Sequence, residues 1–162
     1  MSLMQRIGGW VALGVRGVEF LTPVIDLALR LYVANVFFRS GLVKIQSWTS
    51  TLSLFEYEYA VPLLSPAVAA YLGTAAELVL PVFLALGLGA RLTALALFIF
   101  NWIAVISYPD ISDAGIKDHV LWGWLLAVAF FHGPGKLSMD HFIERWYRQR
   151  PAPPHGRASP AS

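Results

Sequence analysis

Four apolar stretches divide this chain into segments of similar length. They cover residues 24–45, 66–86, 92–108 and 116–132. An α-helix rises about 1.5 Å per residue, so about 20 apolar residues cross the roughly 30 Å hydrocarbon core of a bilayer. The connection between the second and third stretches is only a Gly-rich turn, which implies a tight hairpin. The pattern therefore predicts an all-α, four-span antiparallel transmembrane helix bundle over residues 23–137.

The segment before the first span, residues 1–22, is apolar but interrupted. Arg6 precedes an apolar run, and Arg16 and Glu19 then break it. No small-residue cleavage site of the A-x-A type follows, as a secretory signal peptide requires. We therefore expect an uncleaved segment that lies at the membrane interface.

The segment after the last span predicts one more helix. Gly133-Pro134-Gly135 ends the span, and Ser138 has the side chain of a helix N-cap. Within residues 138–150 the apolar positions have the 0, 3, 4, 7, 8 spacing of one helix face. They are Met139, Phe142, Ile143, Trp146 and Tyr147. We expect an amphipathic helix on the membrane surface, followed by a disordered Pro/Ala/Ser-rich tail over residues 151–162.

Basic residues gather on alternate connections. They occur before the first span, in the turn at Arg91 and after the fourth span, whereas residues 48–65 form a predicted loop without Lys or Arg. Lysine and arginine favour the cytoplasmic side. The sequence therefore predicts a multi-pass protein of the bacterial cytoplasmic (inner) membrane, with both termini in the cytoplasm.

Composition supports the membrane assignment and excludes several functions. Only 14% of the 162 residues are charged, against roughly 25% in soluble domains. No cysteine is present, which excludes a disulfide framework and Cys-bound iron–sulfur clusters. His119 and His132 share one span at roughly 20 Å, too far apart to bind one haem iron. No metal-ligand cluster, nucleotide motif or nucleic-acid-binding stripe is found.

Charged side chains inside the spans are the first candidate site. An ionisable residue within the membrane is costly and therefore marks a functional candidate. Arg39 and Glu77 lie at depths that differ by roughly one helical turn, so a buried ion pair between them is expected. Asn101 of the third span could hydrogen-bond Glu77. Two interpretations stay open: a structural pair that fixes helix register, or a proton or ligand site.

Aromatic residues at the predicted outer mouth are the second candidate site. His119 could donate to a quinone carbonyl, and Trp122 and Tyr108 could supply flat apolar walls. The alternative is an interfacial histidine within an aromatic belt, where Trp and Tyr are common. Quinone is the only cofactor that this arrangement suggests.

Three sequence stretches together resemble the DoxX family of small four-helix membrane proteins. The first is RSGLVKI, residues 39–45, and the second is Glu77 followed by LVLPVFLALGLGARLTALAL. The third, HVLWGWLLAVAFFHGPGKLSMDHF, carries a Gly-Pro-Gly-x-x-Ser-x-Asp exit that ends at Asp140. The resemblance covers residues 24–145 and implies a four-helix membrane bundle.

The resemblance implies two classes of function. Some family members belong to membrane-bound oxidoreductase complexes, so the first hypothesis is a membrane subunit of a redox system with quinone contact. The alternative is a membrane accessory or transport factor for a metal-binding peptide or secretion pathway, without redox chemistry of its own. Either class implies other membrane or soluble subunits as partners besides the bilayer. The family name brings no universal catalytic residue, so whether the protein is an enzyme stays open.

Overall fold

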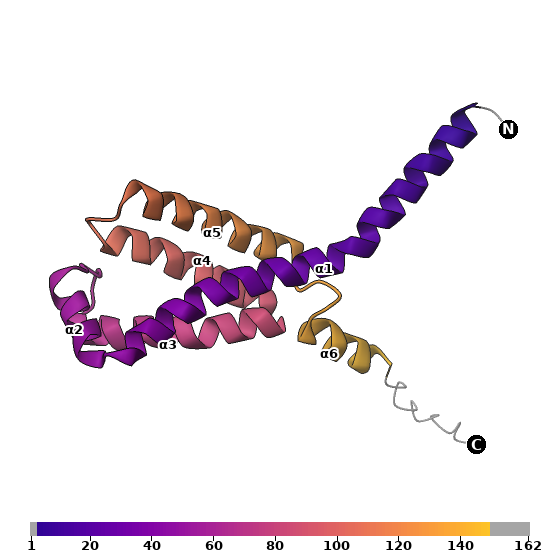
Figure 1. Cartoon of the computed structure of the whole chain (residues 1–162). Helices are drawn as coiled ribbons and strands as arrows, with labels where there is room; N and C mark the ends of the chain where they lie inside the picture. The colour runs from indigo at the N-terminus through magenta and orange to yellow at the C-terminus, as the bar shows by residue number, and fades with distance from the viewer. Residues whose placement is uncertain (1–2, 150–162) are drawn as a thin grey trace, which may run out of the picture.

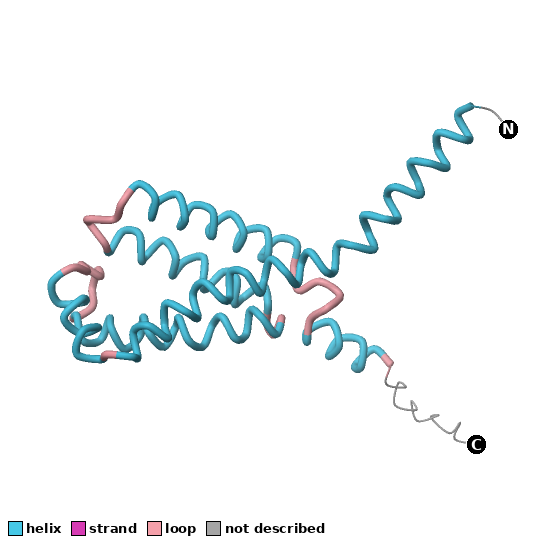
Figure 2. Tube along the Cα trace, viewed as in Figure 1, coloured by secondary structure: helices cyan, strands magenta, loops and turns pink. Residues whose placement is uncertain are grey.

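A computed structural model describes residues 3–149 of the chain, and that part contains α-helices and no strand (Figures 1 and 2). The helices are α1 (Leu3–Gln46), α2 (Trp48–Tyr57), α3 (Pro66–Leu86), α4 (Ala90–Ser107), α5 (Asp113–His132) and α6 (Met139–Arg148). Four of them, α1, α3, α4 and α5, are long and apolar enough to cross a membrane. The predicted all-α, four-span bundle is confirmed.

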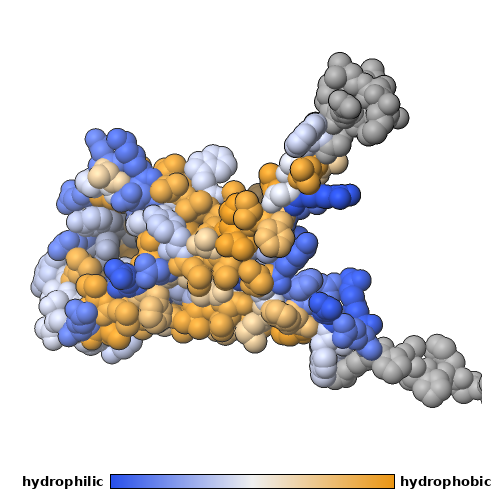
Figure 3. Space-filling model, turned by 45° about the vertical axis from the view of Figure 1, so that its right-hand side comes forward, coloured by the Kyte–Doolittle hydropathy of each residue, from blue (hydrophilic) through white to orange (hydrophobic). Residues whose placement is uncertain are grey.

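The bundle has two ends, which we name after the short helices beside them. The α2 end holds α2 and the α4–α5 connection, and the α6 end holds α6 and the α3–α4 turn (Figure 1). Figure 3 shows an apolar band across the bundle with hydrophilic residues toward both ends. The four crossings alternate in direction, so α1 enters the bundle at the same end at which α5 leaves it.

Local sequence explains where the helices begin and end. Pro66 occupies the first turn of α3, where its fixed φ is favourable. Gly87 ends α3 with a φ of 66°, in the left-handed region that favours glycine. The hydroxyl of Ser138 accepts a hydrogen bond from the amide of His141 and caps α6. The predicted limits of α3 and the predicted start of α6 after Ser138 are thus confirmed.

α1 is longer than predicted. It runs without interruption for 44 residues, or about 66 Å, through Pro23. Its N-terminal part extends beyond the bundle as a single helix (Figure 1). The boundary expected after residue 22 is therefore not a helix end, whereas the interfacial location of that segment stays a prediction. The expected disordered tail, residues 151–162, lies outside the described residues.

The predicted loop over residues 48–65 is wrong in its first half, because residues 48–57 form α2. Ser47 caps this helix by accepting a hydrogen bond from the amide of Ser50. Thr51 and Phe55, one turn apart, are buried. Phe55 packs with Ala69 and Ala70 of α3 in a small apolar cluster. This packing against α3, which is not local in sequence, stabilises a short helix that its own residues alone would not.

The main core lies between the four spans. Its buried residues come from each of them: Val33, Ala34, Phe37, Leu84, Ala94, Leu97, Leu126 and Ala129. Polar residues interrupt this core at a few points, and those points define the candidate site.

Candidate functional site

A buried ion pair joins α1 to α3. Lys44 Nζ lies 2.6 Å from Glu77 Oε2 and 2.8 Å from Oε1, and the two side chains are only 11% and 8% exposed. The hydroxyl of Ser40 donates to Glu77 Oε1 at 3.1 Å and accepts from Lys44 Nζ at 3.0 Å. All three donor positions of the ammonium group are therefore used within this group, which compensates for the loss of water around both charges.

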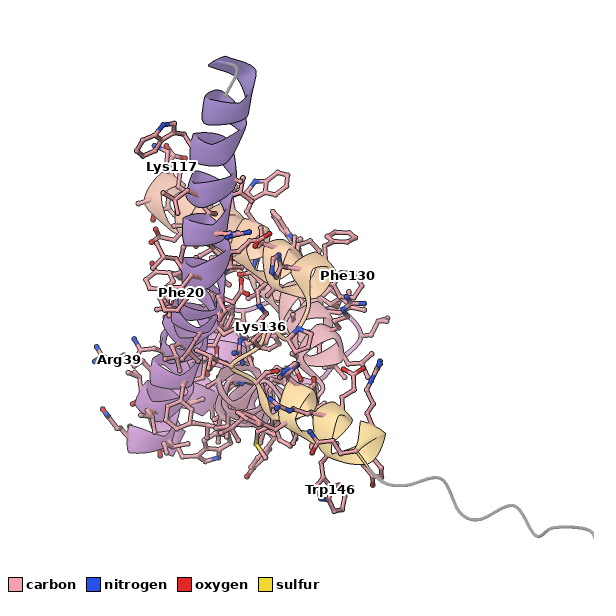
Figure 4. All side chains as sticks on the ribbon, turned by 90° about the vertical axis from the view of Figure 1, so that its right-hand side faces the viewer. Phe20, Arg39, Lys117, Phe130, Lys136 and Trp146 are labelled. Carbon is pink, nitrogen blue, oxygen red and sulfur yellow. The ribbon has the colours of Figure 1, made fainter. Side chains whose placement is uncertain are left out.

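The predicted Arg39–Glu77 pair is wrong. Glu77 is buried as expected, but its partner is Lys44, and Arg39 is exposed. Figure 4 shows the Arg39 side chain directed away from the bundle. At about 100° per residue, Arg39 lies on the opposite side of α1 from Gly41, which faces α3. The Arg39–Glu77 pair was predicted from the similar depths of the two residues in the membrane. It does not form because the face of α1 that carries Arg39 is turned away from α3.

Gly41 allows α1 and α3 to approach closely at this point. A Cβ atom at Gly41 would lie 2.9 Å from the side chain of Leu78 and 3.0 Å from the Cβ of Glu77. Small residues at such crossings permit close contact between membrane helices. Lys44, one turn after Ser40, then reaches the carboxylate across the contact. The sequence signal for this pair is the spacing of three residues: Lys44 comes four residues after Ser40 and three after Gly41. A comparison of the depths of charged residues in the membrane does not use that spacing.

A cavity of about 270 Å³ adjoins the ion pair. It lies between α2, α3 and α4, in the half of the bundle nearer the α2 end. Its walls are mainly apolar, and Glu77 is the deepest lining residue on α3. The lining residues include Lys44, Phe55, Tyr59, Leu64, Leu72, Ala76, Glu77, Phe100, Ile103, Ala104 and Ser107. Two lining residues, Leu72 of α3 and Ile103 of α4, are 57% and 39% exposed, so the cavity is not closed off by the helices around it.

Tyr59 and Ser107 bring hydroxyl groups to the cavity wall. Burial, and after it the negative charge of Glu77, raises the pKa of Tyr59, so this phenol stays protonated and able to donate. Among the described residues, no hydrogen bond of the Tyr59 hydroxyl is found, and the buried Ser107 Oγ also has no partner. The Ser107 Oγ has almost no accessible surface, so the Tyr59 hydroxyl is the one of these two groups that a polar ligand atom in the cavity could reach.

The second candidate site does not assemble as predicted. His119 Nδ1 lies 2.8 Å from Asn101 Oδ1, and Asn101 Nδ2 donates to the His119 carbonyl at 2.9 Å. The ring of Trp122 lies 4.8 Å from that of His119. Tyr108 instead packs on Tyr59 at 5.2 Å. None of His119, Trp122 and Tyr108 is among the residues that line the cavity at Glu77.

Asn101 also has a different role from the one expected. It is fully buried, but it binds α5 through His119 rather than α3 through Glu77. The physical reason is its position on α4: Asn101 faces α5, whereas the neighbouring Phe100 and Ala104 face α3 and the cavity. Asn101 and His119 therefore join α4 to α5, which is the interhelical role common for such residues.

A second polar cluster closes the α6 end. The guanidinium of Arg30, only 1% exposed, donates to the carbonyl oxygens of Leu84, Ala85 and Leu137 at 3.4, 3.3 and 2.5 Å. Two of these carbonyls belong to the last turn of α3, where helical partners are missing and positive charge is favourable. Arg30 thus ties α1 to the end of α3 and to the α5–α6 connection.

Asp140 completes this cluster from α6. Its carboxylate accepts hydrogen bonds from the amides of Gly89 and Ala90 at 2.8 and 2.9 Å, and its own amide donates to the Gly87 carbonyl at 3.1 Å. It therefore acts as an N-cap for α4 that comes from another helix. We name Arg30, Gly87, Ser138 and Asp140 the clamp. It accounts for the Ser and Asp of the Gly-Pro-Gly-x-x-Ser-x-Asp motif.

The fold, the Lys44–Glu77 pair and the clamp define the class of protein. It is a small four-span helical membrane protein with a buried ion pair beside an apolar cavity. The DoxX family model matches residues 25–109, more than half of the chain, and the chain belongs to the DoxX family. A protein of Haemophilus influenzae, named only as an uncharacterized protein, is 28% identical over 151 residues, 89% of this chain and 91% of the relative. No solved structure matches the chain.

Proposed function

We propose that this protein is the membrane subunit of a redox system and that its cavity binds the head group of a lipid quinone. The observation that carries the proposal is an apolar cavity whose deepest point is the Lys44–Glu77 pair. Ligand sites are typically apolar hollows with a few well-placed polar groups. A quinone needs such walls for its ring and hydrogen-bond donors for its two carbonyl oxygens.

The residues present fit this ligand in size and in donors. The cavity volume of about 270 Å³ is just below the range of about 300–1,000 Å³ for drug-sized ligands, so it suits a single ring. Phe55 and Phe100 offer flat apolar walls. The exposed lining residues Leu72 of α3 and Ile103 of α4 mark the path by which an isoprenoid chain would extend into the bilayer. Within residues 3–149, the hydroxyl of Tyr59 is the accessible group without a partner that a carbonyl oxygen would satisfy.

The chain's own residues would bind the quinone ring and would accept or donate protons. A quinone takes up two electrons and two protons when it is reduced. Tyr59 would hold one carbonyl by hydrogen bonding, and Glu77, with Lys44 beside it, is a carboxylate that can accept or release a proton at the cavity floor. With no cysteine in the chain, the electrons would come from a partner oxidoreductase, which agrees with the role of a subunit.

The test is the quinone content of purified protein. Ala104→Phe should fill the cavity and lower the retained quinone at least about tenfold, because ring and side chain would compete for the same volume. Ala75→Phe is the matched control, since Ala75 is exposed on α3 and does not line the cavity. Tyr59→Phe should lower the content about fivefold through the loss of one hydrogen bond. Equal quinone in all three folded variants would refute the site.

The orientation in the membrane is a second expected result. Reporter fusions after Glu58 and after Asp113 should score as external, and fusions at Gly89 and after Arg150 as cytoplasmic. The reason is the gathering of basic residues on the connections of the α6 end. An external score at Gly89 would overturn this orientation and put the cavity in the inner half of the bilayer.

A further inference from the structure

Polar residues form a stripe on the outer face of α1. Tyr32 is 51% exposed, and Asn35, Arg39 and Gln46 are exposed as well. At about 100° per residue these four positions fall within one quarter of the helix circumference. The buried face of α1, with Arg30, Val33, Ala34 and Phe37, is on the opposite side. We call Tyr32, Asn35, Arg39 and Gln46 the polar stripe.

Arg39, the charged member of the stripe, lies inside the apolar layer of the bundle. Gly41 is level with Leu78 of α3, because a Cβ at Gly41 would touch that side chain. Arg39 is two residues nearer the α6 end, level with Leu80, and α3 ends six residues later at Leu86. At 1.5 Å per residue, the Arg39 backbone is therefore about 9 Å inside the α6-end edge of that layer.

An arginine at this depth needs hydrogen-bond acceptors. No hydrogen bond or ion pair of Arg39 is found within residues 3–149, and Figure 4 shows its side chain pointing outward. Charged residues in membrane spans almost always face a protein interior or pair with another group. Here the neighbouring α1 side chains supply one amide, Asn35, four residues away. The bundle therefore leaves the Arg39 guanidinium to acceptors outside it, which are water and headgroups at the α6-end edge, within reach of a long side chain, or a partner in the bilayer.

The spacing of the stripe is that of a helix–helix seam. Its members follow one another by three, four and seven residues, which matches a heptad repeat. Beside it runs a shallow groove of about 270 Å³ between α1 and α3. Asn35 lines this groove together with the small residues Ala34 and Ala85. Small residues next to polar ones are typical of contacts between membrane helices.

The charge of Arg39 distinguishes between the helices that could bind to the polar stripe, which are a second copy of this chain or a different membrane protein. In a pair of copies with the same orientation in the bilayer, Arg39 would meet Arg39 at equal depth, which is repulsive. At this level the chain has a single acidic residue, Glu77, and Lys44 already binds it. We propose that the polar stripe docks a transmembrane helix of a second membrane protein, and that this helix pairs an Asp or Glu with Arg39.

The test uses a designed single-span probe helix of leucine and alanine with one Glu six residues from one end. Association with the full-length protein would be measured by energy transfer in vesicles of neutral lipid. The Glu probe should bind, and Arg39→Leu should lower its association constant roughly tenfold, as expected for loss of a polar contact between membrane helices. Arg16→Leu, which removes an exposed arginine of α1 outside the four-helix bundle, should leave it unchanged.

Two further probes separate charge pairing from general affinity. A probe with Gln in place of Glu, and one with Glu moved to the terminal residue, should both bind weakly. Arg39→Glu should lose the Glu probe and gain a probe with Lys at the same depth. Equal binding of all probes would overturn the proposal. So would self-association that Arg39→Leu abolishes, or an Arg39 effect that appears only with anionic lipid, since these outcomes assign the stripe to a second copy or to a headgroup.

Discussion

Glu77→Leu should destabilise the protein by about 3–5 kcal/mol, because it leaves the Lys44 ammonium buried without its counter-charge. The pair lies in the contact between α1 and α3, and its two side chains are only 11% and 8% exposed. Lys44→Leu should have a similar effect through the unpaired carboxylate. The measurement is the free energy of unfolding in mixed detergent micelles.

The double variant Lys44→Leu with Glu77→Leu distinguishes the ion pair from simple packing. Replacing both partners of a buried pair with apolar residues is often neutral, so this variant should recover most of the loss. Arg39→Leu is the matched control and should change the unfolding free energy little in the isolated protein, since Arg39 is exposed. If the double variant were as unstable as the sum of the single ones, the two groups would not act as a pair.

Gly87→Ala should be the most harmful of the glycine substitutions in the α3–α4 turn. A Cβ at Gly87 would collide with the Arg30 guanidinium and with Ser138. The residue also has a φ of 66°, which costs an L-residue about 1–2 kcal/mol. Together with overpacking, which costs about 1–3 kcal/mol, the total loss should be about 2–5 kcal/mol in the same unfolding experiment.

Gly89→Ala is the control for that change. Gly89 has a similar φ of 56°, but the nearest atom to its Cβ would be Thr93 Oγ1 at 4.0 Å. It should therefore show only the backbone cost of about 1–2 kcal/mol. Equal losses for the two alanine variants would mean that the close packing of Arg30 on the turn contributes nothing.

The fold was predictable because hydropathy and helix-end signals are local. Pro66 and Gly87 limit α3, and Ser138 begins α6, each through the conformation or hydrogen bond of one residue. α2 was missed because it depends on Phe55 packing against α3. Nothing within residues 48–57 alone favours a helix strongly enough to predict it.

The site was only partly predictable because the hydrogen-bond and ion-pair partners of a buried residue depend on which face of its helix points toward which neighbour. Glu77 and Asn101 are buried as expected, yet their partners are Lys44 and His119. The span around Arg39 has polar residues on more than one face, among them Asn35, Arg39 and Lys44, so its sequence does not show which face meets α3. Arg30 is buried because the α5–α6 connection covers it and supplies the Leu137 carbonyl. These contacts join residues more than fifty positions apart in some cases, and no local pattern encodes them.

The clamp has a consequence for biosynthesis. Asp140 is made 51 residues after the Gly89 amide that it caps, a delay of about 3–10 s at typical translation rates. Until Asp140 is made, the first amides of α4 lack this cap, and until Leu137 is made Arg30 lacks that acceptor. Closure waits for α6, so a nascent chain that stops before Asp140 has all four spans and still an open α6 end. Quality control that detects unpaired backbone at that surface would then distinguish finished from truncated copies.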